Sequence, residues 1–244
     1  MSTPGEVWKS EALVRTFVDG IRSAIPLAQE QIEVMLRLVE ARGAPAKNFA
    51  DLGCGNGILS MALLERFPNA VATLVDFSQP MIDEARSLLK AHASSCQFTS
   101  ADLSEAQWAR SVADRAPFDV VVSGYAIHHL PDLRKRQLYG EVFGLLKPGG
   151  LFANTEHVES ATAWIEGISD NLLIDSLHAH HSNHGSDKSR EQVAEEFVNR
   201  PDKAANILVP VELQCEWLRE CGFEDVDCYF KVFELAIFGG RRPK

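Results

Sequence analysis

The strongest structural signal in this chain is the stretch Asp51-Leu52-Gly53-Cys54-Gly55-Asn56-Gly57. Asn48-Phe49-Ala50 before it predicts a strand, and the run from Ile58 to Phe67 after it predicts a helix. Glycine allows backbone angles that a side chain would block, and it lets a ligand approach the main chain closely. The first turn of the helix adds unpaired N–H groups. We therefore expect this strand–turn–helix unit to hold a nucleotide-like ligand.

The composition is that of an ordinary globular protein, and the length suffices for one large domain or for one domain with a cap. The chain has 244 residues, of which 45% are hydrophobic and 24% are charged. No apolar run reaches the length of a membrane span, and the first residues lack a basic start followed by an apolar block. The five cysteines include no CxxC pair, which favours reduced thiols. We expect a cytoplasmic protein with no membrane partner.

The charge bears on the choice of partner. A net charge of −10 repels phosphate backbones, so nucleic acid is a disfavoured partner unless one face carries a basic patch. The tight basic clusters are Arg134-Lys135-Arg136 and Arg241-Arg242, and both could equally be solvated ends of elements. A small molecule is the expected partner, and a homodimer is one option for the assembly.

Strands and helices alternate beyond the glycine turn, which predicts a parallel sheet with right-handed crossovers. The expected strands are 49–52, 71–75, 97–99, 118–123 and 151–154. Helical stretches follow, and then a helix and two strand-like runs, 226–232 and 233–238. We expect one domain in four parts: an N-terminal helical cap segment (1–45), a ligand-binding core (46–156), a helical lid (157–209), and a final helix with a strand pair (210–244).

Three carboxylates fall at the ends of successive strands: Asp51, Asp76 and Asp102. Ligands of open α/β sheets bind at this edge. Asp76 lies near the spacing at which a carboxylate accepts both hydroxyls of a ribose. Asp102 could accept a hydrogen bond from an adenine amine, with Leu103 offering a backbone N–H. Two side chains are expected to pack against the purine: Phe77 and Met81.

Several motifs together resemble class I S-adenosylmethionine-dependent methyltransferases. They are DLGCGNG, LVDFS, SADLS, FDVVVSGYAIHHL and LKPGG, spread over residues 48–155. The resemblance implies an α/β, Rossmann-like seven-stranded sheet in the order 3-2-1-4-5-7-6, with the last strand antiparallel and a helical cap. It also implies S-adenosylmethionine as cofactor. NAD fits less well, because its GxGxxG turn would need glycine where this chain has Ile58.

The same resemblance distributes the cofactor along the turn. Asp51, Gly53 and Gly55 would lie along the methionine part, Asp76 at the ribose, and Asp102 with Leu103 at the adenine. Ser123 would line the site beside the sulfonium, together with Gly124.

A narrower resemblance concerns the cap. Arg22-Ser23-Ala24-Ile25-Pro26, and the stretch from His178 to Gln214, look like the tRNA wobble-uridine carboxymethyltransferase family. In that family an arginine of the cap holds the carboxylate of carboxy-S-adenosylmethionine, and Arg200 is the nearest match. Arg22 could read the same carboxylate or a phosphate. The chain departs from that family at Asn56-Gly57 and at His128-His129.

Methyl transfer requires an in-line approach, exclusion of water and sometimes a base. His129 is the expected base, with Glu156 as a second candidate. His129 could instead only cap the following turn. Tyr125 and His128 are expected to contact the acceptor. The cluster His178, His180, His181 and His184 could share a helix face. A metal site there is possible but is not the expectation, and one of these histidines could instead face the acceptor.

Three functions therefore stand as alternatives. The first is methyl transfer to a small-molecule acceptor. The second is carboxymethyl transfer to a tRNA wobble uridine from carboxy-S-adenosylmethionine. The third is a non-catalytic module that only binds S-adenosylmethionine.

Overall fold

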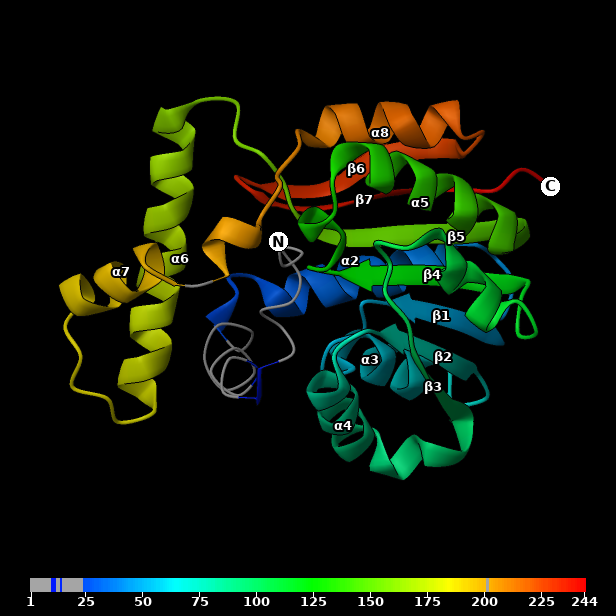
Figure 1. The fold of residues 1–244 in the computed structure, drawn as a ribbon, viewed down its shortest axis with the longest axis horizontal. Helices are drawn as coiled ribbons and strands as arrows, with labels where there is room; N and C mark the ends of the chain where they lie inside the picture. Colours follow the sequence, from blue (N-terminus) through cyan, green and yellow to red (C-terminus); the bar gives the residue numbers. More distant parts are fainter. Residues whose placement is uncertain (1–9, 12–13, 15–23, 201) are drawn as a thin grey trace.

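The computed structural model of the protein describes residues 10, 11, 14, 24–200 and 202–244. Arg22, expected at the substrate, lies outside these residues. The strands are β1 (Asn48–Leu52), β2 (Val71–Asp76), β3 (Cys96–Ser100), β4 (Phe118–Gly124), β5 (Leu146–His157), β6 (Glu224–Val232) and β7 (Leu235–Arg241). They form one seven-stranded sheet in the order β3-β2-β1-β4-β5-β7-β6 (Figure 1). β1 to β5 pair in parallel, whereas β7 is antiparallel to β5 and β6. The predicted strand order is confirmed.

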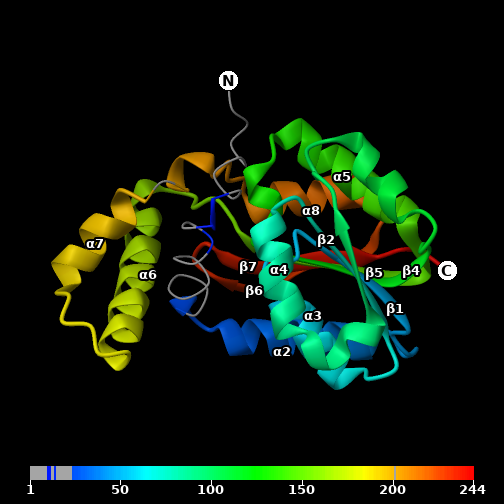
Figure 2. The ribbon, with the colours of Figure 1, turned by 60° about the horizontal axis from the view of Figure 1, so that its bottom comes forward.

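Helices cover both faces of the sheet. They are α2 (Ala28–Ala41), α3 (Ile58–Arg66), α4 (Gln79–Leu88), α5 (Asp132–Leu145) and α8 (Val211–Glu220). α5 and α8 cover one face, and α2 and α3 lie on the other (Figure 2). Short 3-10 turns lie between these elements: η4 (Lys90–Ser95), η5 (Ala106–Val112) and η6 (Ile127–His129).

Strand β4 shows how the sequence builds two apolar faces. Val120 and Val122 pack into the core on the side of α2 and α3, whereas Val121 packs into the core on the side of α5 and α8. Side chains alternate between the faces of a strand, so a continuous apolar run is what a strand covered on both faces requires.

Strand boundaries differ from the prediction, most of all at the start of β5 and at the turn before β7. β5 begins at Leu146, directly after α5, because Leu146 pairs with Phe118 before a register shift. The Lys147-Pro148-Gly149-Gly150 segment therefore lies within the strand. Phe233, expected in the last strand, instead has a positive φ of 52° and forms with Glu234 the tight turn between β6 and β7.

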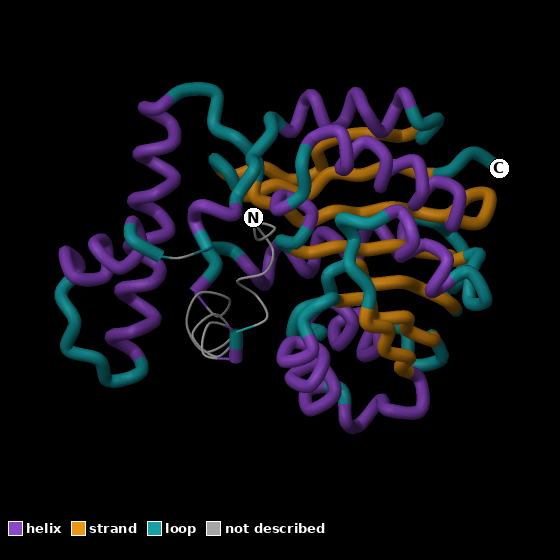
Figure 3. The backbone as a smooth tube through the Cα atoms, in the orientation of Figure 1, coloured by secondary structure: helices purple, strands orange, loops and turns teal. Residues whose placement is uncertain are grey.

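The cap lies beyond the carboxyl ends of the parallel strands, which the arrows of Figure 1 mark, and its helices stand apart from the sheet (Figure 3). It consists of α6 (Ala163–Asn183), α7 (Arg190–Val198) and the 3-10 turn η7 (Lys203–Ala205). An apolar cluster joins α6 to α7 and to Ala24; it comprises Ala24, Ile174, Leu177, Val193 and Phe197. Within the described ranges, no helix has both the length and the apolar character needed to cross a membrane.

The basic cluster Arg134-Lys135-Arg136 is not a solvated end. Arg134 is 7% exposed and Lys135 is 1% exposed, although both lie in the first turns of α5. Only Arg136, whose side chain is 50% exposed, faces solvent. The sequence could not separate these cases, because burial here depends on distant segments: Arg134 donates to the Leu103 carbonyl and Lys135 to the Ile207 carbonyl. Two of its three charges are therefore unavailable to a phosphate backbone.

The Asp119 carboxylate connects three segments of the chain at the amino edge of the sheet. Asp119 accepts hydrogen bonds from the Lys147 ammonium and from the amides of Lys47 and Asn48, each at 3.0 Å. Burial by itself would raise the pKa of the Asp119 carboxyl, but these donors outweigh it and the pKa is lowered. We expect Asp119→Asn to lower the free energy of unfolding at pH 7 by about 1–3 kcal/mol, measured by urea denaturation.

The sign of the pH dependence follows from the lowered pKa. The stabilisation is present above the unfolded-state pKa of about 4 and is lost as pH falls through the lower folded-state value. Asp114→Asn is the control, because its side chain is 75% exposed. A difference between the two variants that persists unchanged into strong acid contradicts this explanation.

Candidate active site

The glycine turn adopts backbone angles that favour glycine, as the sequence predicted. Gly53, Gly55 and Gly57 have positive φ values of 62°, 51° and 81°. At Gly53 a Cβ atom would overlap the Cβ of Ala126, so this position needs glycine for space as well as for conformation. At Gly55 a Cβ would meet only the Met81 sulfur, at 4.0 Å. The turn is therefore open at Gly55, where a ligand can approach the main chain.

Asp76, at the end of β2, is preorganised by the turn. Its Oδ2 accepts the Gly55 amide at 2.9 Å and its Oδ1 accepts the Ser78 amide at 2.8 Å. Burial raises the pKa of the Asp76 carboxyl, and these backbone hydrogen bonds oppose the rise. Each carboxylate oxygen has a second lone-pair site with which to accept a hydroxyl.

The other two strand-end carboxylates have different surroundings. Asp51 is 1% exposed, and its Oδ2 accepts the Ser60 hydroxyl at 2.7 Å, so it braces α3 against β1. Asp102 accepts the Ser104 amide at 2.8 Å. The carbonyl of Leu103 accepts Arg134 Nε at 2.8 Å, which ties this loop to α5.

The remaining predicted cofactor contacts are placed as follows. Met81 is buried on α4 beside Gly55, and Phe77 is half-buried directly after Asp76. Ser123 differs from the expectation, because its side chain is fully buried and its hydroxyl donates to the Leu52 carbonyl at 2.7 Å. Its side chain therefore joins β4 to β1, and only its backbone could line the site.

Two cavities adjoin at the carboxyl edge of the sheet. The first, about 240 Å³, lies against the glycine turn and α2 and is lined by Asn56, Ile58, Gln31 and Thr155 among others. The second, about 80 Å³, lies under the cap. Ile25 and Tyr125 line both cavities, so a ligand in one can meet a ligand in the other at these side chains. We call the second cavity the cap pocket.

The cap pocket combines polar residues from the core with residues from the cap. Its polar lining is His128, His129, His157, Arg200, Asp202 and Asn206; apolar residues from the cap include Leu173, Leu177 and Phe197. The Arg200 guanidinium stacks 4.1 Å from the Phe197 ring centroid, and its Nε lies 3.3 Å from Asp202. Three of the predicted substrate contacts, Tyr125, His128 and Arg200, therefore meet in one pocket.

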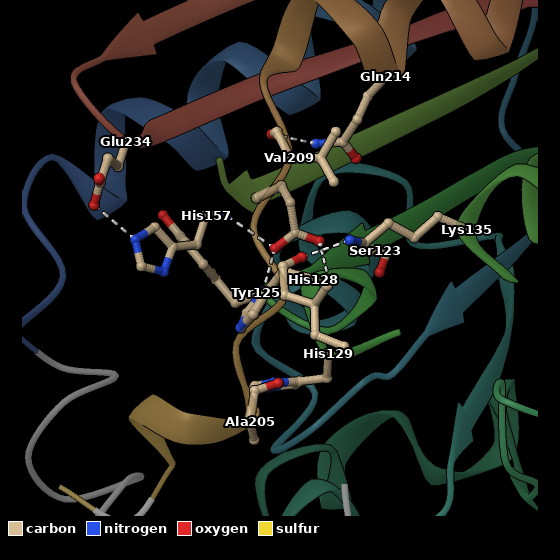
Figure 4. A network of polar contacts seen from close by, with 12 residues as sticks. Ser123, Tyr125, His128, His129, Lys135, His157, Ala205, Val209, Gln214 and Glu234 are labelled. Atoms are coloured by element: carbon tan, nitrogen blue, oxygen red, sulfur yellow. Dashed lines mark hydrogen bonds and ion pairs between the residues drawn. The ribbon is translucent and has the colours of Figure 1, made fainter. Parts of the chain in front are cut away.

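A carboxylate–imidazole pair underlies this pocket (Figure 4). His128 Nδ1 lies 2.5 Å from Glu156 Oε1, and the His128 amide donates to Glu156 Oε2 at 3.0 Å. The His157 amide also donates to Glu156, at 2.9 Å. Glu156 is fully buried, so it is not a base that contacts substrate; it instead orients His128. With Nδ1 holding the proton, Nε2 of His128 is the proton-accepting nitrogen.

His129 is less suited to be the base than the sequence suggested. Its Nδ1 contacts the Ala205 carbonyl at 3.1 Å, and its ring lies 3.9 Å from that of His128. Burial first, and then the charge of His128, hold the pKa of His129 well below its usual range. A group with such a pKa stays neutral near pH 7 and accepts a proton weakly.

Tyr125 holds an unusual backbone at the junction of the cavities. Its φ is +53°, in the left-handed region that few residues other than glycine adopt. Its amide donates to the Thr155 carbonyl at 2.8 Å, and its hydroxyl donates to Gln31 Oε1 at 2.6 Å. Strained backbone of this kind is concentrated at functional sites.

Sequence reasoning missed several residues of this region. Gln31 was part of an expected helix, and nothing in its spacing marks it as the partner of Tyr125. Glu234 was expected within a strand, but it accepts from His157 Nε2 at 2.9 Å and from the Ser169 hydroxyl at 3.2 Å. No local pattern predicts such contacts between distant parts of a chain.

The four clustered histidines, three on α6 and His184 directly after it, do not line the cap pocket. His184 Nδ1 contacts the His180 carbonyl at 2.8 Å, and the two rings lie 4.2 Å apart. Over the ranges that the structure describes, no group of three or more potential ligands is arranged to hold a metal ion.

Comparisons with known proteins bear on the family and the fold. Residues 49–150 match the family described as Methyltransferase domain. The carboxy-S-adenosyl-L-methionine synthase of Shewanella amazonensis is 25% identical over 228 residues, which cover 90% of this chain and 86% of that protein. The protein of the same name from Chromohalobacter salexigens is 28% identical over 235 residues, covering 93% and 80%. An O-methyltransferase family protein from Burkholderia thailandensis has the same fold, with a TM-score of 0.58 at 19% identity, covering 98% and 67%.

The relatives bear on both resemblances. The cap resembles a family that uses carboxy-S-adenosylmethionine, and the curated relatives carry the name of its synthase, so the narrower resemblance is consistent with them. The buried Asp76 carboxylate and the open backbone at Gly55 fit a ligand with a ribose and an amino-acid tail. The family match over residues 49–150 and the strand order together support a class I S-adenosylmethionine-dependent methyltransferase.

Proposed function

We propose that this protein transfers a methyl group to a small molecule bound in the cap pocket. The observation that carries the proposal is the pair of adjoining cavities, which share Ile25 and Tyr125. One cavity lies at the glycine turn and the other contains His128. Residues 157–209 act as a lid over the acceptor in this proposal, and the compartment is the cytoplasm.

The side chains suit an acceptor that loses a proton from oxygen or nitrogen. S-adenosylmethionine, when bound, supplies a methyl group on a sulfonium, which needs no further activation. His128 Nε2 accepts the acceptor's proton, and Glu156 stabilises the imidazolium through its 2.5 Å contact with Nδ1. Leu173, Leu177 and Phe197 of the cap exclude water from the reacting groups.

The direct test uses S-adenosylmethionine labelled in its methyl group and a panel of small hydroxylated and amino compounds. Label that reaches a panel compound only with the protein present supports the proposal. A protein that binds the donor, shown by calorimetry, but labels no member of a broad panel favours the non-catalytic alternative.

A second candidate is chemistry on carboxy-S-adenosylmethionine. Two observations favour it: the names of the curated relatives and the presence of Arg200 in the cap pocket, where a cation could hold a carboxylate. Native mass spectrometry of protein purified from cells separates the two candidates. A retained ligand heavier than S-adenosylmethionine by one carboxylate supports this second candidate, and retained S-adenosylmethionine or its demethylated product supports the first.

The ribose assignment of Asp76 yields a separate prediction. Asp76→Asn removes the charge from a carboxylate placed to accept ribose hydroxyls, while the amide oxygen can keep one backbone contact. We expect S-adenosylmethionine to bind about 1–3 kcal/mol more weakly, measured by calorimetry. Asp83→Asn, at an exposed position on α4, is the control. Unchanged affinity in Asp76→Asn would show that the ribose lies elsewhere.

A further inference from the structure

Lys135 is a buried cation that the proposed chemistry does not use. It is 1% exposed, and its ammonium lies 3.0 Å from Asp132 Oδ1 and 2.5 Å from the Ile207 carbonyl. Burial lowers the pKa of Lys135, while Asp132, Glu156 and Glu159 act to raise it. Burying an ammonium costs free energy, and a methionine of similar length would fill the same space without that cost.

Ile207, whose carbonyl accepts from Lys135, belongs to the segment by which the chain returns from the cap to the core. This return segment, residues 205–209, lies across the turn that carries the two histidines. The Ile207 amide donates to the His128 carbonyl at 2.9 Å, and the Ala205 carbonyl contacts His129 Nδ1 at 3.1 Å. Lys135 reaches in from α5 beside the same turn (Figure 4).

The far end of the return segment is also held. The Val209 carbonyl accepts the Glu159 amide at 3.1 Å and Gln214 Nε2 at 3.1 Å. The outgoing and returning connections of the cap are thereby joined at the core. One residue within this segment, Ile207, is therefore held through both of its backbone polar groups: its N–H donates to the His128 carbonyl, and its own carbonyl accepts from Lys135.

We propose that Lys135 is a positioning residue, which clamps the return segment and through it fixes both the cap and the backbone of His128. The inference rests on the proposed function, because it assigns the reacting role to His128. The ammonium donates to the Ile207 carbonyl, which orients the Ile207 amide towards His128. Without it, the cap and the His128 turn lose their common anchor while the glycine turn is untouched.

The test compares Lys135→Met with Arg136→Met. The two positions are adjacent on α5, but Arg136 is exposed and pairs with Glu220 at 2.6 Å. We expect Lys135→Met to lower kcat about 10- to 100-fold, as misplaced reacting groups do, with the dissociation constant for S-adenosylmethionine unchanged. Arg136→Met should change neither. Hydrogen–deuterium exchange should be faster in peptides covering residues 127–129 and 205–209 of Lys135→Met only.

The exchange measurement keeps this inference separate from the proposed function, since it needs no acceptor. Unchanged exchange in both peptides, with the variant folded, overturns the clamp even if methyl transfer is established. If exchange rises as expected but no acceptor is methylated by the wild type, the proposed function fails and the clamp stands as a cap anchor. If Lys135→Met fails to fold, Asp132→Asn takes its place, because Asp132 pairs with Lys135 and its side chain is half-exposed. We expect a smaller increase of hydrogen–deuterium exchange in the same two peptides. Exchange at the wild-type rate in Asp132→Asn overturns the clamp.

Discussion

His128→Asn is expected to lower the rate of methyl transfer about 10²- to 10⁴-fold, the range over which a positioned general base contributes. The asparagine amide can still donate to Glu156 in place of Nδ1, so the buried carboxylate keeps a partner. What the substitution removes is Nε2, the nitrogen that takes the proton. The rate is measured with the acceptor found in the panel, and donor affinity by calorimetry should stay at the wild-type value.

His129→Asn is the matched control, because its amide can still donate to the Ala205 carbonyl. We expect a much smaller effect, since the low pKa of His129 makes it a weak proton acceptor. The reverse outcome, a large loss in His129→Asn and a small one in His128→Asn, would restore His129 as the base. A small loss in both variants would mean that the acceptor needs no base.

Gly53→Ala is expected to destabilise the fold and to abolish tight binding of S-adenosylmethionine. The new Cβ would have to occupy the space of the Ala126 Cβ, and the alanine would have to hold a φ of +62°. The turn must shift, and with it the Asp76 contacts that depend on its backbone. Overpacking of this kind costs about 1–3 kcal/mol beyond the conformational term, measured by urea denaturation.

Gly43→Ala separates the two causes. Gly43 has a φ of +72° but nothing within 4 Å of an added Cβ, so its replacement tests the conformational cost alone, about 1 kcal/mol. The double variant Gly53→Ala with Ala126→Gly removes the overlap and should recover part of the stability. Equal losses in Gly43→Ala and Gly53→Ala, with no recovery in the double variant, contradict the overlap with Ala126.

The elements that sequence predicted well are those with local causes. The alternation of apolar strands with helices predicted the sheet, and the glycines of the first turn predicted its backbone. The position of Asp76 at the edge of the sheet was also predictable, because it lies between the end of a strand and the start of a helix. Strand ends were less well predicted: Leu146 joins β5 because Phe118 lies across from it, and that pairing is not local.

Roles that depend on long-range contacts were predicted less well. Glu156 and His128 are 28 positions apart in sequence, and only their 2.5 Å contact shows that the carboxylate orients one histidine. Lys135 belongs to a run of three basic residues in the sequence, but it is buried and donates to the carbonyl of Ile207, 72 positions away. Ser123 was expected at the sulfonium, but its hydroxyl bonds a neighbouring strand.

The amino-acid sequence by itself determined the order of strands and helices along the chain and the glycine turn, because these depend on local backbone preferences and on residues close in the chain. The resemblance of its motifs to a known family indicated the cofactor. Only the tertiary structure decided which histidine a buried carboxylate orients, which charges are buried and how the return segment contacts the core. Those features depend on burial and on hydrogen bonds between distant segments, and both arise only when the sheet, the cap and the return segment have packed together.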